Sequence, residues 1–530
     1  RILESIYNKY KTDQWRDKNL YGTALGFRLF RQHGFRAPEG MFLNNIVQSR
    51  LESVCWKTRE SCHVKTCCEL TALVDADVFM KFKDGSGNFK ACLCEDIEGL
   101  LSLYEASYLS MEGETILDEA RDFTTKALKE ALKTGTDQDL ATLVNHALDQ
   151  PLHWRVPRLE ARWFIDAYKK RLDANPTLLE LAKLDSNMVQ AIDQEDLKHM
   201  SSWWKTTGLA ENLSFARDRL METFVWTVGY SFKPEFGYSR RISTKVNALI
   251  TTIDDVYDVY GTFEELELFT CVIERLAQVF FLFCRICYCH LVIGTKRMLF
   301  HSWDVHQMEQ LPDYMKICFL SLYNFVNETA YDIMKEQGPN IIPYLRKVWT
   351  DLCKAYLVEA KWYNNGYIPT LEEYMNNAWI SISAPVMLTH CYFSSTDCIT
   401  EEALECLEKC PNIIRWPAVI LRLIDDLATS SLEFGLTDIA GQEFRCYMHE
   451  TGASEEIARE HVKYLISETW TRMNKDLAAA DSPFHRDFLE TALNVIRMAL
   501  CIYGHGDGHA GQASMSRSRV LSLLVDPNPF

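Results

Sequence analysis

Two acidic clusters constrain the fold of this chain more than any other feature, because both lie in apolar sequence with helical spacing. The first occupies residues 254–258 (DDVYD) and the second residues 425–433 (DDLATSSLE). Carboxylates are costly in apolar surroundings unless they are paired with cations or bound to metal. The fold must therefore bring positive charge to each cluster.

Within each cluster, oxygen-bearing side chains recur every four residues, which places them on one face of a helix. Asp254 and Asp258 form one pair, and Asp425, Thr429 and Glu433 form a ladder. At a rise of about 1.5 Å per residue, this ladder is about 12 Å long. Two facing rows of hard oxygen ligands suit Mg²⁺ ions that also bind a phosphorylated molecule. A helix N-terminus or a solvated helix face is the alternative for the first cluster alone, and the second cluster and the surrounding apolar sequence argue against it.

Apolar residues recur at intervals of three or four along much of the chain, as amphipathic helices require. Residues 116–131 are one example, and few segments alternate apolar and polar residues as half-buried strands do. We therefore predict an all-α protein. Because 530 residues exceed what one hydrophobic core serves, we predict two or more domains, and a boundary in the polar stretch 193–208 would divide the chain into residues 1–200 and 201–530.

The chain has a formal net charge of −17, which argues against a general role in binding nucleic acid or membrane surfaces. Its 18 cysteines lie mostly in apolar helical sequence, which indicates buried thiols in a reducing compartment. Residues 1–10 contain Glu4 and lack an apolar core, so they form neither a signal nor a transit peptide. Since the chain begins at Arg1 rather than Met, we expect further sequence upstream.

Four segments resemble the plant terpene synthases, and most closely the monoterpene synthases of flowering plants. They are residues 152–164 (LHWRVPRLEARWF), 203–205 (WWK), 254–261 (DDVYDVYG) and 503–509 (YGHGDGH). The segments follow one another in the order that the family has. The resemblance implies a catalytically silent N-terminal helical domain and a C-terminal catalytic domain with the class I terpenoid cyclase helical fold.

The resemblance also implies a reaction, the Mg²⁺-dependent ionisation of geranyl diphosphate to a carbocation. Such a step needs the negative charge on the leaving group to be neutralised as it develops, and metal ions do this without proton transfer. Carried onto this chain, Asp254 and Asp258 would hold two Mg²⁺ ions. The residues Asp425, Thr429 and Glu433 would hold a third, and Mn²⁺ is an alternative metal.

Three arginines are the expected partners of the diphosphate. The resemblance makes Arg217 and Arg219 a clamp that closes over the leaving group, and Arg422 a phosphate ligand beside the second cluster. Arginine suits this role because its guanidinium binds phosphate oxygens in a planar fork. Asp255 belongs to the catalytic cluster, but we expect it to pair with a basic side chain rather than bind metal. Taken alone, each arginine is more ordinarily explained by a surface salt bridge.

Family positions also supply residues for the carbocation. Trp226 offers a cation–π face, although by itself it would be taken for a core tryptophan. Asn247 lies seven residues before the first cluster, at a position that is commonly Asn in monoterpene cyclases and Phe in isoprene synthases. Tyr503 and His509 are candidate proton acceptors, in competition with diphosphate itself, and Asp507 is expected to support the phosphate-binding arginines.

We also expect a helix break at residues 381–385 (SISAP), because Pro385 has no backbone N–H. In the family such a break directs carbonyl dipoles into the active-site cavity. A packing kink without a chemical role is an equal alternative.

Four features depart from the family. The family's N-terminal tandem-arginine motif is absent. Residues 41–77 and 276–302 do not resemble sequences of the family, and the lysine that usually follows the second cluster is replaced within residues 440–443. The two unmatched blocks hold 7 of the 18 cysteines, and we interpret them as translated intron sequence. Residues 276–293 are too interrupted for a membrane span, and their cysteines lack the second ligand pair of a zinc site.

The sequence therefore predicts a terpene synthase, a lyase that converts geranyl diphosphate to a monoterpene. We expect a monomer without nucleic-acid or membrane partners, and the family implies a plastid location. The alternatives are an inactive product of the same family, a synthase that uses farnesyl or dimethylallyl diphosphate, and a helical scaffold with incidental acidic patches. The sequence does not predict which monoterpene is released.

Overall fold

The computed structural model describes residues 19–34, 76–274, 305–429, 442–479, 481–504 and 513–529. Across these ranges the regular structure is helical, and the only β pairing is an isolated bridge between Lys83 and Phe89. The predicted all-α class is confirmed. All of the unmatched block 276–302 and most of the block 41–77 lie outside the described residues.

Packing divides the chain into two compact units. The N-terminal unit comprises residues 1–154 together with 471–480, and the C-terminal unit comprises residues 155–470 and 481–530. The predicted domain boundary at residue 200 is a different division, and it stays a prediction. In the described part of the chain, no helix combines the length and the apolar character that crossing a membrane requires.

The N-terminal unit is built from short helices around one apolar core. Its helical elements are α2 (Leu20–Gln32), η1 (Ala76–Phe82), η2 (Ala91–Glu95), α4 (Ile97–Ser107), α5 (Thr115–Thr134), α6 (Gln138–Asp149) and η3 (Leu152–Trp154). The periodicity noted at residues 116–131 is that of α5, which buries Ile116 and Ala120 and packs Phe123 against the same core. That core also holds Phe27 and Leu103 from α2 and α4.

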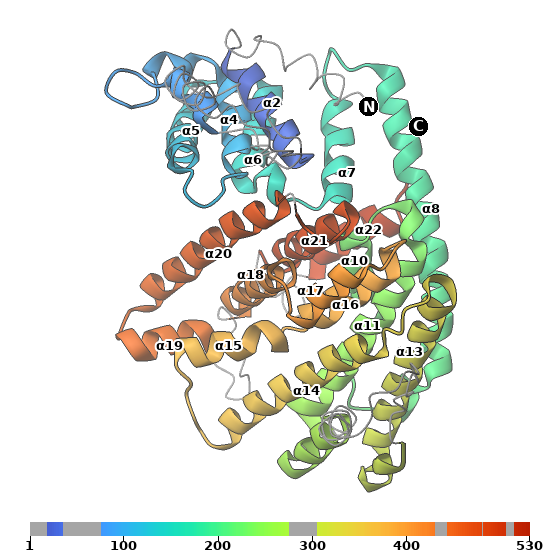
Figure 1. Cartoon of the computed structure of the whole chain (residues 1–530). Coiled ribbons are helices and arrows are strands. Elements are labelled where there is room, and N and C mark those ends of the chain that lie inside the picture. Colours follow the sequence, from blue (N-terminus) through green and yellow to red (C-terminus); the bar gives the residue numbers. More distant parts are fainter. Residues whose placement is uncertain are drawn as a thin grey trace, which may run out of the picture. The chain divides into compact units, whose positions relative to one another are not determined.

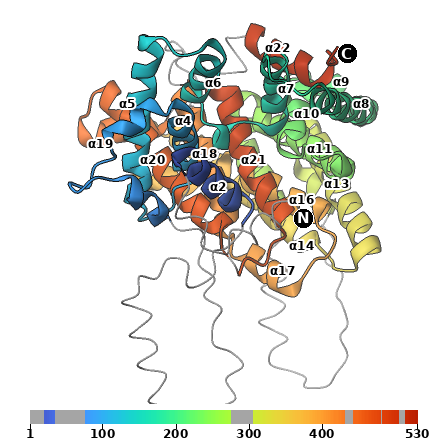
Figure 2. The ribbon, with the colours of Figure 1, turned by 90° about the horizontal axis from the view of Figure 1, so that it is seen from above.

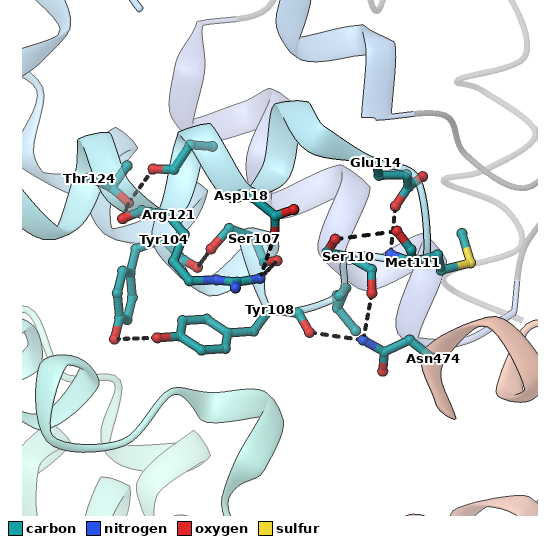
Figure 3. Close-up of polar contacts among 12 residues, drawn as sticks. Tyr104, Ser107, Tyr108, Ser110, Met111, Glu114, Asp118, Arg121, Thr124 and Asn474 are labelled. Atoms are coloured by element: carbon teal, nitrogen blue, oxygen red, sulfur yellow. Dashed lines mark hydrogen bonds and ion pairs between the residues drawn. The ribbon is translucent and has the colours of Figure 1, made fainter. Parts of the chain in front are cut away.

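The segment 471–480 belongs to the N-terminal unit through polar contacts as well as packing (Figure 3). The amide of Asn474 donates to the carbonyl oxygens of Tyr108 at 3.1 Å and Ser110 at 2.9 Å. Its Oδ1 lies 2.9 Å from Nε2 of the buried His153. Asn474 thus satisfies backbone groups that would otherwise be buried without partners.

The C-terminal unit contains the long helices of the chain (Figure 1). Its helical elements are α7 (Pro157–Tyr168), α8 (Pro176–Thr207), α9 (Leu209–Asn212), α10 (Leu220–Tyr230), η4 (Pro234–Phe236), α11 (Gly237–Asp255), η5 (Val256–Tyr260), η6 (Val305–Gln310), α13 (Asp313–Gln337), α14 (Ile342–Asn364), α15 (Leu371–Ser381), α16 (Ala384–Ser395), α17 (Glu401–Glu408), α18 (Asn412–Thr429), α19 (Gln442–Thr451), the part of α20 (Glu455–Leu477) that precedes residue 471, α21 (Arg486–Tyr503) and α22 (Ala513–Leu524). A further helix covers residues 263–274.

Helix α11 lies in the middle of this unit and carries the start of the first acidic cluster. It packs against α8, α10, α13 and α16, and Figures 1 and 2 show α10 and α11 side by side. Most of its surface is buried, including residues such as Ile242, Val246 and Leu249. Because its neighbours surround it, the position of the cluster is fixed by the core of the unit.

Helix α8 runs unbroken across residue 200 and ends at Thr207, where Gly208, with a φ of 64°, forms a left-handed C-cap. Ion pairs join it to α11. The fully buried Arg240 lies 3.3 Å from Asp193 and 2.9 Å from Asp196, and Arg241 lies 2.6 Å from Asp196. These pairs anchor the helix that leads to the first cluster.

Candidate active site

The first acidic cluster lies where the helix changes its winding. Helix α11 ends at Asp255, and residues 256–260, with Asp258 among them, form the π-helical turn η5. We expected uninterrupted α-helical spacing between Asp254 and Asp258, so the π turn is a refinement of that prediction. The turn closes at Gly261, where a Cβ atom would lie 2.8 Å from the carbonyl oxygen of Val256, so glycine is needed.

Burial and mutual repulsion raise the pKa values of the carboxylates in this region. Burial, opposed by Arg217, raises the pKa of Asp254. Restricted hydration, then repulsion from Asp254 and Glu359, raises the pKa of Asp258 to about 8, although its side chain still reaches solvent. The protein therefore compensates the ionised form of these carboxyl groups only in part, so a bound cation would favour their ionisation.

Asp255 has its counter-ion within the protein. Its carboxylate is fully buried, and it accepts hydrogen bonds from the backbone N of Arg217 at 2.7 Å and from Nε of Arg217 at 2.6 Å. Nη2 of the same guanidinium donates to Oδ2 of Asp254 at 2.9 Å. The expected pairing of Asp255 with a basic side chain is observed. Arg219, the second residue of the expected clamp, pairs with Glu222 at 3.0 Å.

The second cluster is organised around an arginine on its own helix. Arg422 of α18 forms ion pairs with Asp425 and, at 2.5 Å, with the fully buried Asp426. Tyr374 of α15 donates its hydroxyl to the other oxygen of Asp426 at 2.7 Å. Helix α18 ends at Thr429, whose side chain lies outside the described part of the structure, as does Glu433. The ladder as a metal site therefore stays a prediction.

Glu359 of α14 links the two clusters, and sequence reasoning missed it. Burial is the largest cause of the rise in the pKa of Glu359 to about 7. The charge of the Glu359 carboxylate also interacts with Arg422 and Asp426 of α18 and with Asp254 of the first cluster. Its Oε1 accepts a hydrogen bond from Ser381 at 2.6 Å. The available signal was spacing alone, because Leu352, Tyr356 and Glu359 fall four and three residues apart on the buried face of α14.

The expected helix break is present beside Glu359. Helix α15 ends at Ser381, α16 begins at Ala384, and Ser383 has a left-handed φ of 64°. The hydroxyl of Ser383 donates to the carbonyl oxygen of Ile382 at 2.6 Å. The break therefore positions Ser381 against the carboxylate of Glu359, whereas a role for its carbonyl dipoles stays a prediction.

The aromatic residues expected near the carbocation are brought together. The ring centroids of Trp226 on α10 and Tyr503 on α21 lie 6.0 Å apart. Asn247 of α11 is buried and donates its amide to the hydroxyl of Tyr230 at 3.2 Å, while its buried Oδ1 has no hydrogen-bond partner among the residues that the structure describes. Two other predicted site residues, Asp507 and His509, lie outside the described residues.

The donor set fits Mg²⁺. Asp254, Asp258 and Glu359 carry hard carboxylate oxygens and have raised pKa values, whereas the nearby Arg217 and Arg422 pair with Asp255 and Asp426. Over the ranges that the structure describes, no three His, Cys, Asp or Glu side chains form a ready-made metal site. Mg²⁺ is commonly held by one or two carboxylates together with water and substrate phosphate oxygens, so a partial protein site is the expected form.

Comparison with protein families identifies both halves of the chain. Residues 205–472 match the family described as "Terpene synthase family, metal binding domain", and residues 73–148 match "Terpene synthase, N-terminal domain". The curated protein "Myrcene synthase, chloroplastic" of Quercus ilex is 55% identical over 531 residues, which cover 100% of this chain and 78% of that protein.

Solved structures give the same result for the fold. Isoprene synthase from grey poplar (Populus x canescens), in complex with three Mg²⁺ ions and dimethylallyl-S-thiolodiphosphate, is 43% identical with a TM-score of 0.82, covering 99% of this chain and 88% of that one. Limonene synthase with 2-fluorolinalyl diphosphate is 42% identical with a TM-score of 0.83, covering 100% and 86%. The expected class I terpenoid cyclase fold is confirmed.

Proposed function

The chain belongs to the terpene synthase family, and from that premise we propose that it is a Mg²⁺-dependent monoterpene synthase that ionises geranyl diphosphate. The observation that carries the proposal is that an arginine pairs with each acidic cluster, while the charge of Glu359 interacts with a residue of each. The similarity to a myrcene synthase and to limonene synthase supports a ten-carbon substrate.

The metal ligands would be Asp254 and Asp258 on one side and, on the other, the residues Asp425, Thr429 and Glu433. When bound, Mg²⁺ supplies Lewis-acid neutralisation of the charge that develops on the diphosphate. The protein's own contribution is to direct guanidinium groups toward the same charge. Arg217, Arg219 and Arg422 carry the planar donors that phosphate oxygens accept.

The protein would then control the fate of the allylic cation. Trp226, packed beside Tyr503, presents an aromatic face whose quadrupole stabilises positive charge without reacting with it. Asn247 lies on α11, the helix that leads to the proposed metal ligands, and it donates a hydrogen bond to the hydroxyl of Tyr230. Tyr503 and His509 are the proposed proton acceptors, and Asp507 would support the phosphate-binding arginines.

Product analysis tests this function directly. The purified chain is incubated with geranyl, farnesyl or dimethylallyl diphosphate, with Mg²⁺ or with a chelator, and the volatile products are identified by gas chromatography. We expect a monoterpene from geranyl diphosphate only when Mg²⁺ is present. Asp313→Asn is a suitable control variant, since the Asp313 side chain is 97% exposed on α13.

The outcomes separate the alternatives. A product from farnesyl or dimethylallyl diphosphate in place of geranyl diphosphate would assign another chain length to the same chemistry. No product from any of the three would contradict the proposal and favour an inactive member of the family. If deletion of residues 41–77 and 276–302 then restored activity, those two blocks would be the cause.

Three further proposals accompany the function. Relatives such as the Quercus ilex protein carry the word "chloroplastic" in their names, and we propose a plastid location for this chain. We also propose that the catalytic domain begins near residue 201 and that the protein is a monomer. Light scattering of the purified chain checks the last proposal, which a stable dimer would contradict.

A further inference from the structure

The segment between α9 and α10, residues 213–219, is attached to the first acidic cluster at two points. Arg217 provides the first through its hydrogen bonds to Asp255 and its ion pair with Asp254. Phe215 provides the second, because its ring stacks on that of Tyr260 with the centroids 4.1 Å apart and the planes 4° from parallel. Tyr260 is the last residue of η5, the turn that carries Asp258.

A third ring completes the second attachment, and we call Phe215, Tyr260 and Tyr314 the aromatic clasp. Tyr314 of α13 meets Phe215 and Tyr260 edge-on, with centroid distances of 5.7 and 5.0 Å. Its hydroxyl donates to Oε2 of Glu265 at 2.9 Å, and the same oxygen accepts the backbone N–H of Thr262 at 3.0 Å. The clasp therefore has fixed geometry even though Tyr260 is 55% exposed.

The clasp bears on the chemistry because Phe215 is two residues before Arg217. In the resting protein the guanidinium of Arg217 lies on Oδ2 of Asp254, at 2.9 Å, where a divalent cation would bind. Two cations cannot share one carboxylate oxygen at close range without strong repulsion. Contacts that hold Arg217 in this position therefore oppose metal binding to Asp254. The same contacts set the position of the Arg217 guanidinium when a diphosphate binds.

Resting on the proposed function, we propose that Phe215 and Tyr260 are positioning residues that keep Arg217 on Asp254 in the absence of substrate. The stack lowers the affinity of the free protein for divalent cations and holds the arginine ready for the diphosphate. Loss of the stack then changes two quantities in opposite senses. Cation binding to the free protein becomes stronger, and capture of the diphosphate becomes weaker.

The first test measures cation binding without substrate. Mn²⁺ is titrated into the full chain, and the free ion is followed by electron paramagnetic resonance. We expect Phe215→Leu and Tyr260→Leu each to bind Mn²⁺ about three- to tenfold more tightly than the wild type, the range that such an aromatic pair supports. Phe215→Tyr retains a stacking ring and should restore the wild-type value.

A double-mutant cycle shows whether the effect passes through Arg217. Arg217→Gln should tighten Mn²⁺ binding at least as much as Phe215→Leu, and adding Phe215→Leu to Arg217→Gln should change nothing further. Phe164→Leu is the matched control, because the Phe164 ring is 44% exposed and stacks on Tyr168 within α7 at 5.8 Å. That control should leave Mn²⁺ binding unchanged.

The second readout is steady-state kinetics with geranyl diphosphate. A positioning role predicts that Phe215→Leu raises KM about three- to tenfold and changes kcat less. Weaker or unchanged Mn²⁺ binding in both leucine variants, or a Phe215→Leu effect that persists in the Arg217→Gln background, would overturn the inference. A wild-type chain that releases no terpene would instead contradict the proposed function, while the Mn²⁺ titration still decides the role of the clasp.

Discussion

The two acidic clusters contain the same Asp-Asp doublet, yet they obtain their counter-ions in different ways. In each doublet one carboxylate is fully buried and paired with arginine, namely Asp255 and Asp426. For the second cluster that arginine is Arg422, on the same helix and 13% exposed. For the first cluster it is Arg217, which comes from a loop 37 residues earlier and is 47% exposed.

This difference separates a fixed charge from a movable one. An ion pair three or four residues apart on one buried helix changes its geometry only if the helix does. A guanidinium on a surface-facing loop can exchange its carboxylate partner for another anion at lower cost. We infer that the ion pairs of the second cluster keep their geometry when substrate binds, whereas the ion pairs of the first cluster rearrange.

The largest expected effect comes from the outer carboxylate of each doublet. Asp254→Ala should lower turnover of geranyl diphosphate by about 10²–10³-fold, because charge stabilisation at the leaving group is lost. Asp425→Ala should lower it less, because that residue is expected to share in one metal ion rather than two. Turnover is measured by product formation, and circular dichroism should show unchanged helix content in both variants. Wild-type turnover in Asp254→Ala would remove the basis of the metal assignment.

The next effect concerns stability and compares the two arginines. Arg422→Met leaves the buried Asp426 without its cation and should lower the free energy of unfolding by about 3–5 kcal/mol. Arg217→Met should cost about 1–2 kcal/mol, because Asp255 keeps the backbone N–H of residue 217 and water can replace the half-exposed guanidinium. Denaturant unfolding measures both. Equal losses would show that the two counter-ions do not differ as we infer.

A smaller effect is expected from the tyrosine that interacts with each doublet. Tyr374→Phe removes the hydroxyl on the buried Asp426 and should cost about 1–3 kcal/mol of unfolding free energy. Tyr356 lowers the pKa of Asp254, whose side chain is 30% exposed, so Tyr356→Phe should cost less than Tyr374→Phe. A larger loss for Tyr356→Phe would reverse the assignment of the rigid and the movable side.

The sequence predicted those features of the site that depend on residues close together along the chain. The helices and the pairing of Asp255 follow from spacing and from the cost of a buried charge, both of which can be read along the chain. The break after Ser381 follows from Pro385. Glu359 carries no motif, and only the packing of α14 places it between the clusters. Sequence alone gives no means of seeing such a tertiary neighbour.

The π-helical turn at residues 256–260 and the aromatic clasp escaped prediction for the same reason. Phe215, Tyr260 and Tyr314 come from three separate elements, so no periodicity relates them. A π turn has the composition of an α-helix, and its extra residue per turn is set by the surrounding packing. The sequence thus supplied the candidate ligands, whose role stays a prediction, and the structure added neighbouring residues that no local pattern indicates.

The smallest expected effect is a dependence of stability on pH that Mg²⁺ should reverse. The pKa values of Asp258 and Glu359 are raised to about 8 and about 7, chiefly by restricted hydration, so the folded protein binds protons that the unfolded chain releases near pH 4. A raised carboxyl pKa stabilises the fold at low pH, and that contribution is lost as pH rises toward 8. Without divalent cations, Tm should therefore fall between about pH 6 and about pH 8.

Mg²⁺ favours the ionised carboxylates, so its stabilising effect should grow over the same pH window. Because Asp258 reaches solvent, we expect a shift of only about 2 °C. Asp193 supplies the internal control, since burial raises its pKa to about 7 at the junction of α8 and α11, where its partner is Arg240. Asp193→Asn should flatten part of the pH dependence and leave the Mg²⁺ response intact. A Mg²⁺ stabilisation equal at both ends of the window would show that protons and metal do not compete for these carboxylates.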